Sequence, residues 1–207
     1  TLASPYLSNS IARTVPPLSK LRSFPLIQRV LVALGLLLMV AGCSTTTPPD
    51  QVLSVPAPPQ KYAAIVVDVR TGKQMFEVNS TAQRYPASLT KMMTLYLLFE
   101  ALQSGRVSKE TQIPVSDHAA GEPPTKMRFR RGETIDVDSA IRAIVVKSAN
   151  DVAVAVGEYL GGSEEQFAAM MTAKARSLGM TGTTFRNASG LPDDSQMTTA
   201  RDMAVLG

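Results

Sequence analysis

The sequence predicts an α+β fold in which a cluster of helices packs against an antiparallel sheet. Two short alternating runs on either side of Thr71 predict a pair of strands. Apolar residues at helical spacing predict several helices after Pro86. The chain has 207 residues, which is enough for one domain with its own core. We expect that domain to begin near Lys61, because the preceding stretch has little to bury.

The predicted strands are Ile65–Val69 and Met75–Val78, and Arg70-Thr71-Gly72 lies between them. A short loop that contains glycine between two alternating runs is a strong signal for a β-hairpin. The sequence therefore predicts a hairpin turn at these three residues.

The helices follow in order along the chain. The first is expected over Ser88–Ser104, a mostly apolar stretch that Gly105 would terminate. Two further helices are expected over Asp138–Val146 and Asp151–Leu160. The next begins with Ser163-Glu164-Glu165-Gln166, which is similar to a capping box, and ends before Gly179. A last helix is expected after Thr198-Thr199.

Ser88 and Lys91 are the candidate nucleophile and base. Residues three apart share one face of a helix, so the Lys91 amine can reach back to the Ser88 hydroxyl. A serine hydroxyl needs an adjacent base to become a good nucleophile. Burial and the positive end of the helix dipole both favour the neutral amine that could act as this base. On its own, however, Ser-x-x-Lys more often marks a helix cap followed by a surface lysine.

A second motif, Ser148-Ala149-Asn150, lies between two apolar helical stretches, where a polar tripeptide predicts a loop that faces a cleft. The two motifs in this order resemble those of active-site serine penicillin-binding proteins and class A β-lactamases. From Lys61 to Gly207 the chain resembles the low-molecular-mass D-alanyl-D-alanine carboxypeptidases. The matching stretches are Pro86–Thr94, Lys147–Val152, Ala173–Met180, Phe185–Pro192 and Thr199–Met203.

This resemblance implies a β-lactamase/transpeptidase-like fold, no cofactor, and roles for four residues. Ser88 would attack the penultimate D-alanine carbonyl of a peptidoglycan stem peptide, and Lys91 would be its base. Ser148 would relay a proton toward the departing D-alanine, and Asn150 would hold the substrate amide. The Ser88 backbone N–H would form half of the oxyanion hole. β-Lactam antibiotics would inhibit by acylating the same hydroxyl.

The chain departs from the family pattern because it contains no Lys-Thr-Gly, the motif that resemblance places on a strand downstream of Asn150. Arg70-Thr71-Gly72 looks similar but precedes the nucleophile. We therefore expect residues 61–207 to be a partial, truncated catalytic domain with only the first two strands of the family sheet. Such a chain is expected to be inactive, or nearly so, when produced alone.

Residues 1–43 predict a leader. Basic residues extend to Arg29, and an apolar run over Val30–Gly42 is too short to span a bilayer comfortably. Val40-Ala41-Gly42-Cys43 is similar to a bacterial lipoprotein signal, which makes Cys43 a candidate for lipidation, although an ordinary signal peptide is the alternative. Residues 44–60 are rich in Pro, Ser and Thr and predict a linker. The expected location is the cell envelope, facing the periplasm.

The charge of the chain argues against a nucleic-acid partner. Four of its 21 basic residues and none of its 17 acidic residues precede Cys43, so the remainder has 17 of each sign. His118 is the only histidine, and no carboxylates cluster around it in the sequence, so no metal site is expected. The basic residues within Lys126–Arg131 predict a solvated strand face.

Two other functions stay open at this stage. A class A β-lactamase would share the fold, but it needs an additional glutamate after the Ser-x-Asn loop for deacylation. Glu158, Glu164 and Glu165 all fall on or beside predicted helices. A truncated, non-catalytic envelope lipoprotein that at most binds wall peptide is the second alternative.

Overall fold

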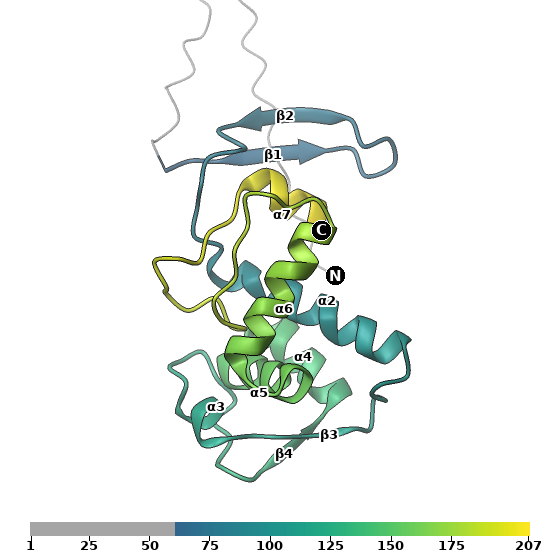
Figure 1. Cartoon of the computed structure of the whole chain (residues 1–207), viewed down its shortest axis with the longest axis vertical. Helices are drawn as coiled ribbons and strands as arrows, with labels where there is room; N and C mark the ends of the chain where they lie inside the picture. Colours follow the sequence, from purple (N-terminus) through teal and green to yellow (C-terminus); the bar gives the residue numbers. More distant parts are fainter. Residues whose placement is uncertain (1–60) are drawn as a thin grey trace, which may run out of the picture. The chain divides into compact units, whose positions relative to one another are not determined.

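A computed structural model describes residues 61–207, which form an α+β unit (Figure 1). The α+β prediction is confirmed. The predicted leader, Cys43 and the linker at residues 44–60 lie outside the described residues. The elements in chain order are β1 (Ala64–Val67), β2 (Gln74–Val78), the 3₁₀ turn η2 (Ala87–Leu89), α2 (Thr90–Gln103), β3 (Gln112–Pro114), α3 (Asp117–Gly121), β4 (Thr134–Asp136), α4 (Val137–Lys147), α5 (Asn150–Gly161), α6 (Glu164–Ser177) and α7 (Ala200–Leu206).

The β1–β2 hairpin confirms the predicted turn. The strands pair antiparallel, with Ala64 opposite Val78. Within the turn, the Gly72 amide donates to the Asp68 carbonyl at 2.8 Å, and the Thr71 amide donates to the Asp68 carboxylate at 2.8 Å. Gly72 adopts the left-handed φ of +69° that a side chain would disfavour. Arg70-Thr71-Gly72 is therefore a turn and not the missing motif.

A second antiparallel pair, β3–β4, was not predicted from the sequence. Each strand is three residues long. Ile113 pairs with Ile135, and both side chains are buried. Runs this short carry too few alternating residues to stand out as strands. The pair is separate from β1–β2, so the described part of the chain contains two small sheets.

Helix α5 is the centre of the core. It packs against α2, α3, α4 and α6 (Figure 1). Its residues from Val152 to Val156 are all 0% exposed, as expected for a helix that is surrounded on every side. The buried start of α5 therefore places Asn150 and Asp151 inside the protein, where they hold neighbouring segments.

The segment Lys126–Arg131 is irregular, which corrects the prediction of a solvated strand. Arg128 has a left-handed φ of 71°, which no strand residue adopts. The buried Asp151 carboxylate accepts hydrogen bonds from the Met127 and Arg128 amides at 3.0 and 2.9 Å. Three backbone donors, counting the Val152 amide, satisfy this carboxylate and fix the path of the segment.

The helix ends follow the predicted local signals. Ser163 caps α6 by accepting from the Gln166 amide at 3.1 Å, and Thr199 caps α7 by accepting from the Asp202 amide at 3.0 Å. Gly179 follows α6 with a φ of +87°, as expected for a helix terminator. None of the helices between residues 61 and 207 has both the length and the apolar composition needed to cross a bilayer.

Candidate active site

Ser88 lies in a 3₁₀ turn that runs directly into α2. Pro86 precedes this turn and is buried, whereas Ser88 is exposed. Ala87 has a left-handed φ of 48°, an uncommon conformation for a residue with a Cβ. Ser88 is thus exposed to solvent on this turn. Because the Ala87 conformation is uncommon, contacts from neighbouring segments must hold the turn in place.

Lys91 is buried one helical turn after Ser88. Its side chain is 4% exposed, and its Nζ donates to Asn150 Oδ1 at 2.8 Å and to the Ser189 carbonyl oxygen. Burial lowers the pKa of Lys91 from 10.5 to about 8, and the nearby Glu122 charge opposes that shift. A neutral amine has two N–H donors and one lone pair, so these two acceptors leave the lone pair available for a proton.

Ser148 and Asn150 lie at the junction of α4 and α5, where a loop was predicted, but Asn150 is already the first residue of α5. Ser148 ends α4 in the left-handed region, with φ 55°. Asn150 is 5% exposed, and its Nδ2 donates to the Pro123 carbonyl at 3.0 Å. Each end of an asparagine amide has two hydrogen-bonding positions, so one at each end is free after the contacts to Lys91 and Pro123.

The sequence predicted that Lys91 would reach back to Ser88. Among residues 61–207, no hydrogen bond joins the Ser88 hydroxyl to Lys91, and the amine is instead held by Asn150 and Ser189. No sequence motif predicts a role for Ser189. The only available signal was its place in Phe185–Pro192, one of the stretches that carried the family resemblance.

The loop that contains Ser189 contacts both Lys91 and the turn that carries Ser88. Thr94 of α2 donates from its hydroxyl to the Ala188 carbonyl at 2.7 Å. Gly190 has a φ of +85°, and a Cβ built there would lie 3.1 Å from the Ser88 amide nitrogen and would overlap the Ala87 carbonyl. The loop therefore fixes the Lys91 amine on one side and the Ser88 backbone on the other.

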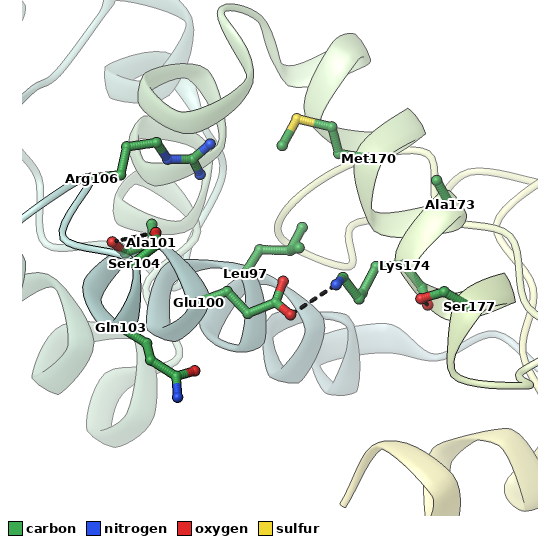
Figure 2. Close-up of a pocket in the computed structure, with 10 residues that line it drawn as sticks. All are labelled: Leu97, Glu100, Ala101, Gln103, Ser104, Arg106, Met170, Ala173, Lys174 and Ser177. Atoms are coloured by element: carbon green, nitrogen blue, oxygen red, sulfur yellow. Dashed lines mark hydrogen bonds and ion pairs between the residues drawn. The ribbon is translucent and has the colours of Figure 1, made fainter.

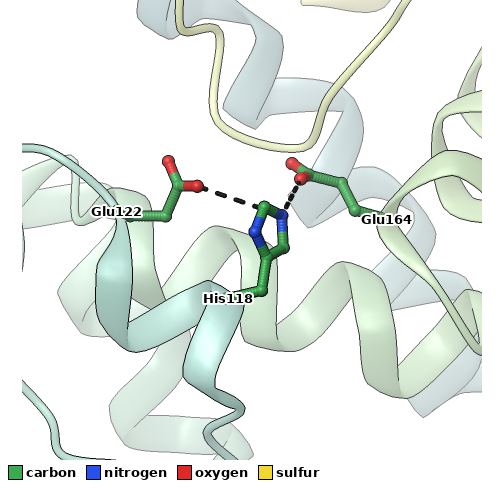
Figure 3. A group of neighbouring side chains, drawn as sticks. All are labelled: His118, Glu122 and Glu164. Carbon is green, nitrogen blue, oxygen red and sulfur yellow. Dashed lines mark hydrogen bonds and ion pairs between the residues drawn. The ribbon is translucent and has the colours of Figure 1, made fainter.

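His118 lies in a cluster of carboxylates, which corrects the expectation that none surrounds it. Its Nε2 is 2.7 Å from Glu164 Oε2 and 4.0 Å from Glu122 Oε1 (Figure 3). The hydrogen bond to Glu164 raises the pKa of His118, and burial together with the Glu164 charge raises the pKa of Glu122. Glu122 follows His118 by four residues, a local spacing that the sequence does contain, whereas Glu164 is 46 positions away and no local pattern joins it to them.

Two surface hollows differ in their distance along the chain from Ser88, since only one of them is lined by its neighbour Ala87. One of about 740 Å³ between α2 and α6 includes the 2.8 Å ion pair of Glu100 with Lys174 (Figure 2). It is lined by none of the candidate catalytic residues. A smaller hollow of about 300 Å³ is lined by Ala87 and Gly190. The smaller hollow borders Ala87, the residue before Ser88, but none of the candidate catalytic residues lines it either.

Comparisons with known proteins agree with the motifs. A family model described as D-alanyl-D-alanine carboxypeptidase matches residues 53–207. The D-alanyl-D-alanine carboxypeptidase DacF of Bacillus subtilis is 35% identical over 144 residues, which are 70% of this chain and 37% of the relative. DacC of Escherichia coli is 35% identical over 151 residues, 70% of this chain and 38% of the relative. The chain thus spans less than two-fifths of the length of either.

Solved structures show the same relationship. The D-alanyl-D-alanine carboxypeptidase DacD from Francisella tularensis superimposes with a TM-score of 0.69 at 38% identity, covering 72% of this chain and 36% of that one. Penicillin-binding protein D2 from Listeria monocytogenes, in its cefotaxime-bound form, gives a TM-score of 0.61 at 31% identity. That match covers 72% of this chain and 62% of the Listeria chain.

Proposed function

The chain belongs to the D-alanyl-D-alanine carboxypeptidase family, and from this premise we propose that its protein removes the terminal D-alanine from peptidoglycan stem peptides. The observation that carries the proposal is the buried Lys91 amine, with a pKa lowered to about 8 and both N–H donors directed at protein acceptors. An amine in this state one turn after an exposed serine has the properties of a general base.

In the proposed reaction, the Ser88 Oγ attacks the carbonyl carbon of the penultimate D-alanine while Lys91 Nζ takes its proton. The Ser88 amide stabilises the oxyanion. The C–N bond then breaks, Ser148 relays a proton to the leaving D-alanine nitrogen, and an ester remains on Ser88. Water hydrolyses this ester and restores the hydroxyl. Asn150 binds the substrate amide through the hydrogen-bonding positions that Lys91 and Pro123 leave free.

The test is covalent labelling with a fluorescent penicillin, performed on the protein as its own cells make it. Label is expected on the peptide that contains Ser88, and Ser88→Ala should abolish it because the acylated oxygen is gone. Ser195→Ala removes another exposed serine hydroxyl and should leave labelling unchanged. Released D-alanine from a pentapeptide substrate gives the second readout. Label that survives Ser88→Ala in a folded protein would remove Ser88 from the proposed role.

The same labelling separates the enzyme from the non-catalytic alternative. A folded protein that takes no label and releases no D-alanine would favour an envelope protein that only binds wall peptide. The 207 residues contain no Lys-Thr-Gly, so this chain produced alone is expected to label weakly or not at all. The β-lactamase alternative is not favoured, because the matching family model, DacF and DacC are all described as D-alanyl-D-alanine carboxypeptidases.

We also propose that residues 1–43 direct export, that Cys43 carries lipid, and that residues 44–60 tether the catalytic domain to a membrane of the cell envelope. The support is the sequence pattern of basic residues, an apolar run and Val40-Ala41-Gly42-Cys43. Cells grown with radioactive palmitate should label the protein, and Cys43→Ala should remove the label, since the thiol is the site of attachment. Label that persists in Cys43→Ala would contradict lipidation at this residue.

A further inference from the structure

Three side chains outside the proposed catalytic set converge on one point. His118 and Glu122 come from α3 and the residue that ends it, and Glu164 is the first residue of α6. One ligand atom from each lies within 4.8 Å of the other two. Figure 3 shows the two carboxylates on opposite sides of the imidazole ring, both directed toward it. One nitrogen and two carboxylate oxygens are a donor set that suits a divalent transition metal.

The surroundings of Glu122 are a second observation that suits a cation site. Glu122 is 9% exposed, and its carboxylate accepts no hydrogen bond from any residue between 61 and 207. Its Oε1 lies 4.0 Å from His118 Nε2, which is an ion pair but is beyond hydrogen-bond distance. A largely buried carboxylate is costly unless it is paired or coordinates a metal, and within residues 61–207 Glu122 has only this long ion pair to His118. Asp151 shows the contrast, because backbone amides satisfy its buried carboxylate.

We propose that His118, Glu122 and Glu164 form a binding site for a divalent transition metal, with Zn²⁺ as the expected occupant. Bonds of about 2.0–2.2 Å in a tetrahedral site place neighbouring ligand atoms about 3.4 Å apart. The separations of 2.7 and 4.0 Å from His118 Nε2 bracket that spacing. The His118 side chain is 56% exposed, so it has room to adjust and a solvent molecule can complete the coordination.

The choice of Zn²⁺ over harder cations follows from the donors. Mg²⁺ and Ca²⁺ prefer sites built from oxygen alone, and Ca²⁺ takes six or more such ligands. An imidazole nitrogen with two carboxylates instead suits Zn²⁺ and its neighbours in the first transition row. His118 is the only histidine of the chain, so no other imidazole site competes for the ion.

The site connects to the proposed active site through Glu164. While Glu164 Oε2 faces His118, Glu164 Oε1 accepts from the Ala188 amide at 3.0 Å. The next residue, Ser189, offers the carbonyl oxygen that holds Lys91 Nζ. A bound ion would therefore join α3 to the start of α6 and fix the loop that positions the base. This is a structural role, because the ion would not touch the proposed nucleophile.

The test is metal binding by the purified full chain after removal of metal with a chelator. A Cys43→Ser background keeps the only cysteine from binding the ion. Calorimetric titration with Zn²⁺ should give one saturable site, and Glu122→Gln and His118→Asn should each weaken it at least tenfold. Glu165→Gln makes the same charge change at the neighbouring exposed residue and should bind Zn²⁺ like the parent.

Cobalt spectroscopy of the parent protein gives a readout that does not depend on how the variants fold. Co²⁺ should produce visible absorption that one equivalent of Zn²⁺ removes. Absence of saturable Zn²⁺ binding, or binding that Glu122→Gln and His118→Asn leave unchanged, would overturn the proposal. So would a Co²⁺ spectrum identical to that of the free ion. None of these readouts requires penicillin binding or carboxypeptidase activity.

Discussion

In the protein as its own cells make it, Lys91→Ala should lower the proposed rate of penicillin acylation by about 10²–10⁴-fold, the range that a positioned general base contributes. The reason is that Lys91 is a buried amine one turn after Ser88. Hydrogen bonds to Asn150 and to the Ser189 carbonyl orient this amine. Stopped-flow measurement of acyl-enzyme formation gives the rate. Circular dichroism checks that the variant folds, and unchanged acylation in a folded variant would exclude Lys91 as the base.

The pH dependence of the same rate tests the protonation state. In the proposed mechanism the neutral amine is the active form, so acylation should rise as pH increases and reach half of its maximum near pH 8, the lowered pKa of Lys91. At lower pH the ammonium holds the proton and cannot accept another. A midpoint near 10.5, the usual lysine value, would show that burial does not lower this pKa.

Removal of the Glu122 charge should shift the pH midpoint of acylation. Because that charge raises the pKa of Lys91, Glu122→Gln should move the midpoint to lower pH. The measurement is made with chelator present, so that no metal ion contributes to the local charge. Glu165→Gln provides the matched control and should leave the midpoint in place. A shift to higher pH in Glu122→Gln would contradict the assigned cause.

Gly190→Ala is expected to abolish acylation and to destabilise the protein. The new Cβ would overlap the Ala87 carbonyl and crowd the Ser88 amide at 3.1 Å, and both are backbone groups that cannot rotate away. The left-handed φ of +85° adds a cost of about 1–2 kcal/mol, and the overlap adds about 1–3 kcal/mol more. Relief requires movement of the turn that carries the nucleophile or of the loop that holds Lys91.

Gly179→Ala is the matched control for this substitution. Gly179 has nearly the same backbone conformation, with φ +87°, but a Cβ there would meet nothing within 4 Å. It should therefore show only the backbone cost in chemical denaturation and should keep normal acylation. Equal effects of Gly190→Ala and Gly179→Ala on stability and on acylation would contradict the prediction. They would show that contact between Gly190 and the Ser88 turn does not matter for either.

The elements that the sequence predicted well are those encoded by neighbouring residues. The hairpin turn follows from the local bonds of Asp68 with Thr71 and Gly72, and the start of α6 follows from the Ser163 cap. The strand expected at Lys126–Arg131 was wrong because a distant carboxylate, Asp151, holds that segment in an irregular path. A local alternation of charges carries no information about such a partner.

By itself, the sequence determined the α+β class, the helices of residues 61–207 other than the short α3, the cap of α6, and the placement of Ser88 and Lys91 one turn apart. Only the tertiary structure decided what surrounds them. Lys91 is held by residues 59 and 98 positions away in the chain, and His118 meets Glu164 across 46 positions. Caps and periodicity depend on residues a few positions apart, whereas these contacts exist only because burial of the core around α5 brings distant segments together.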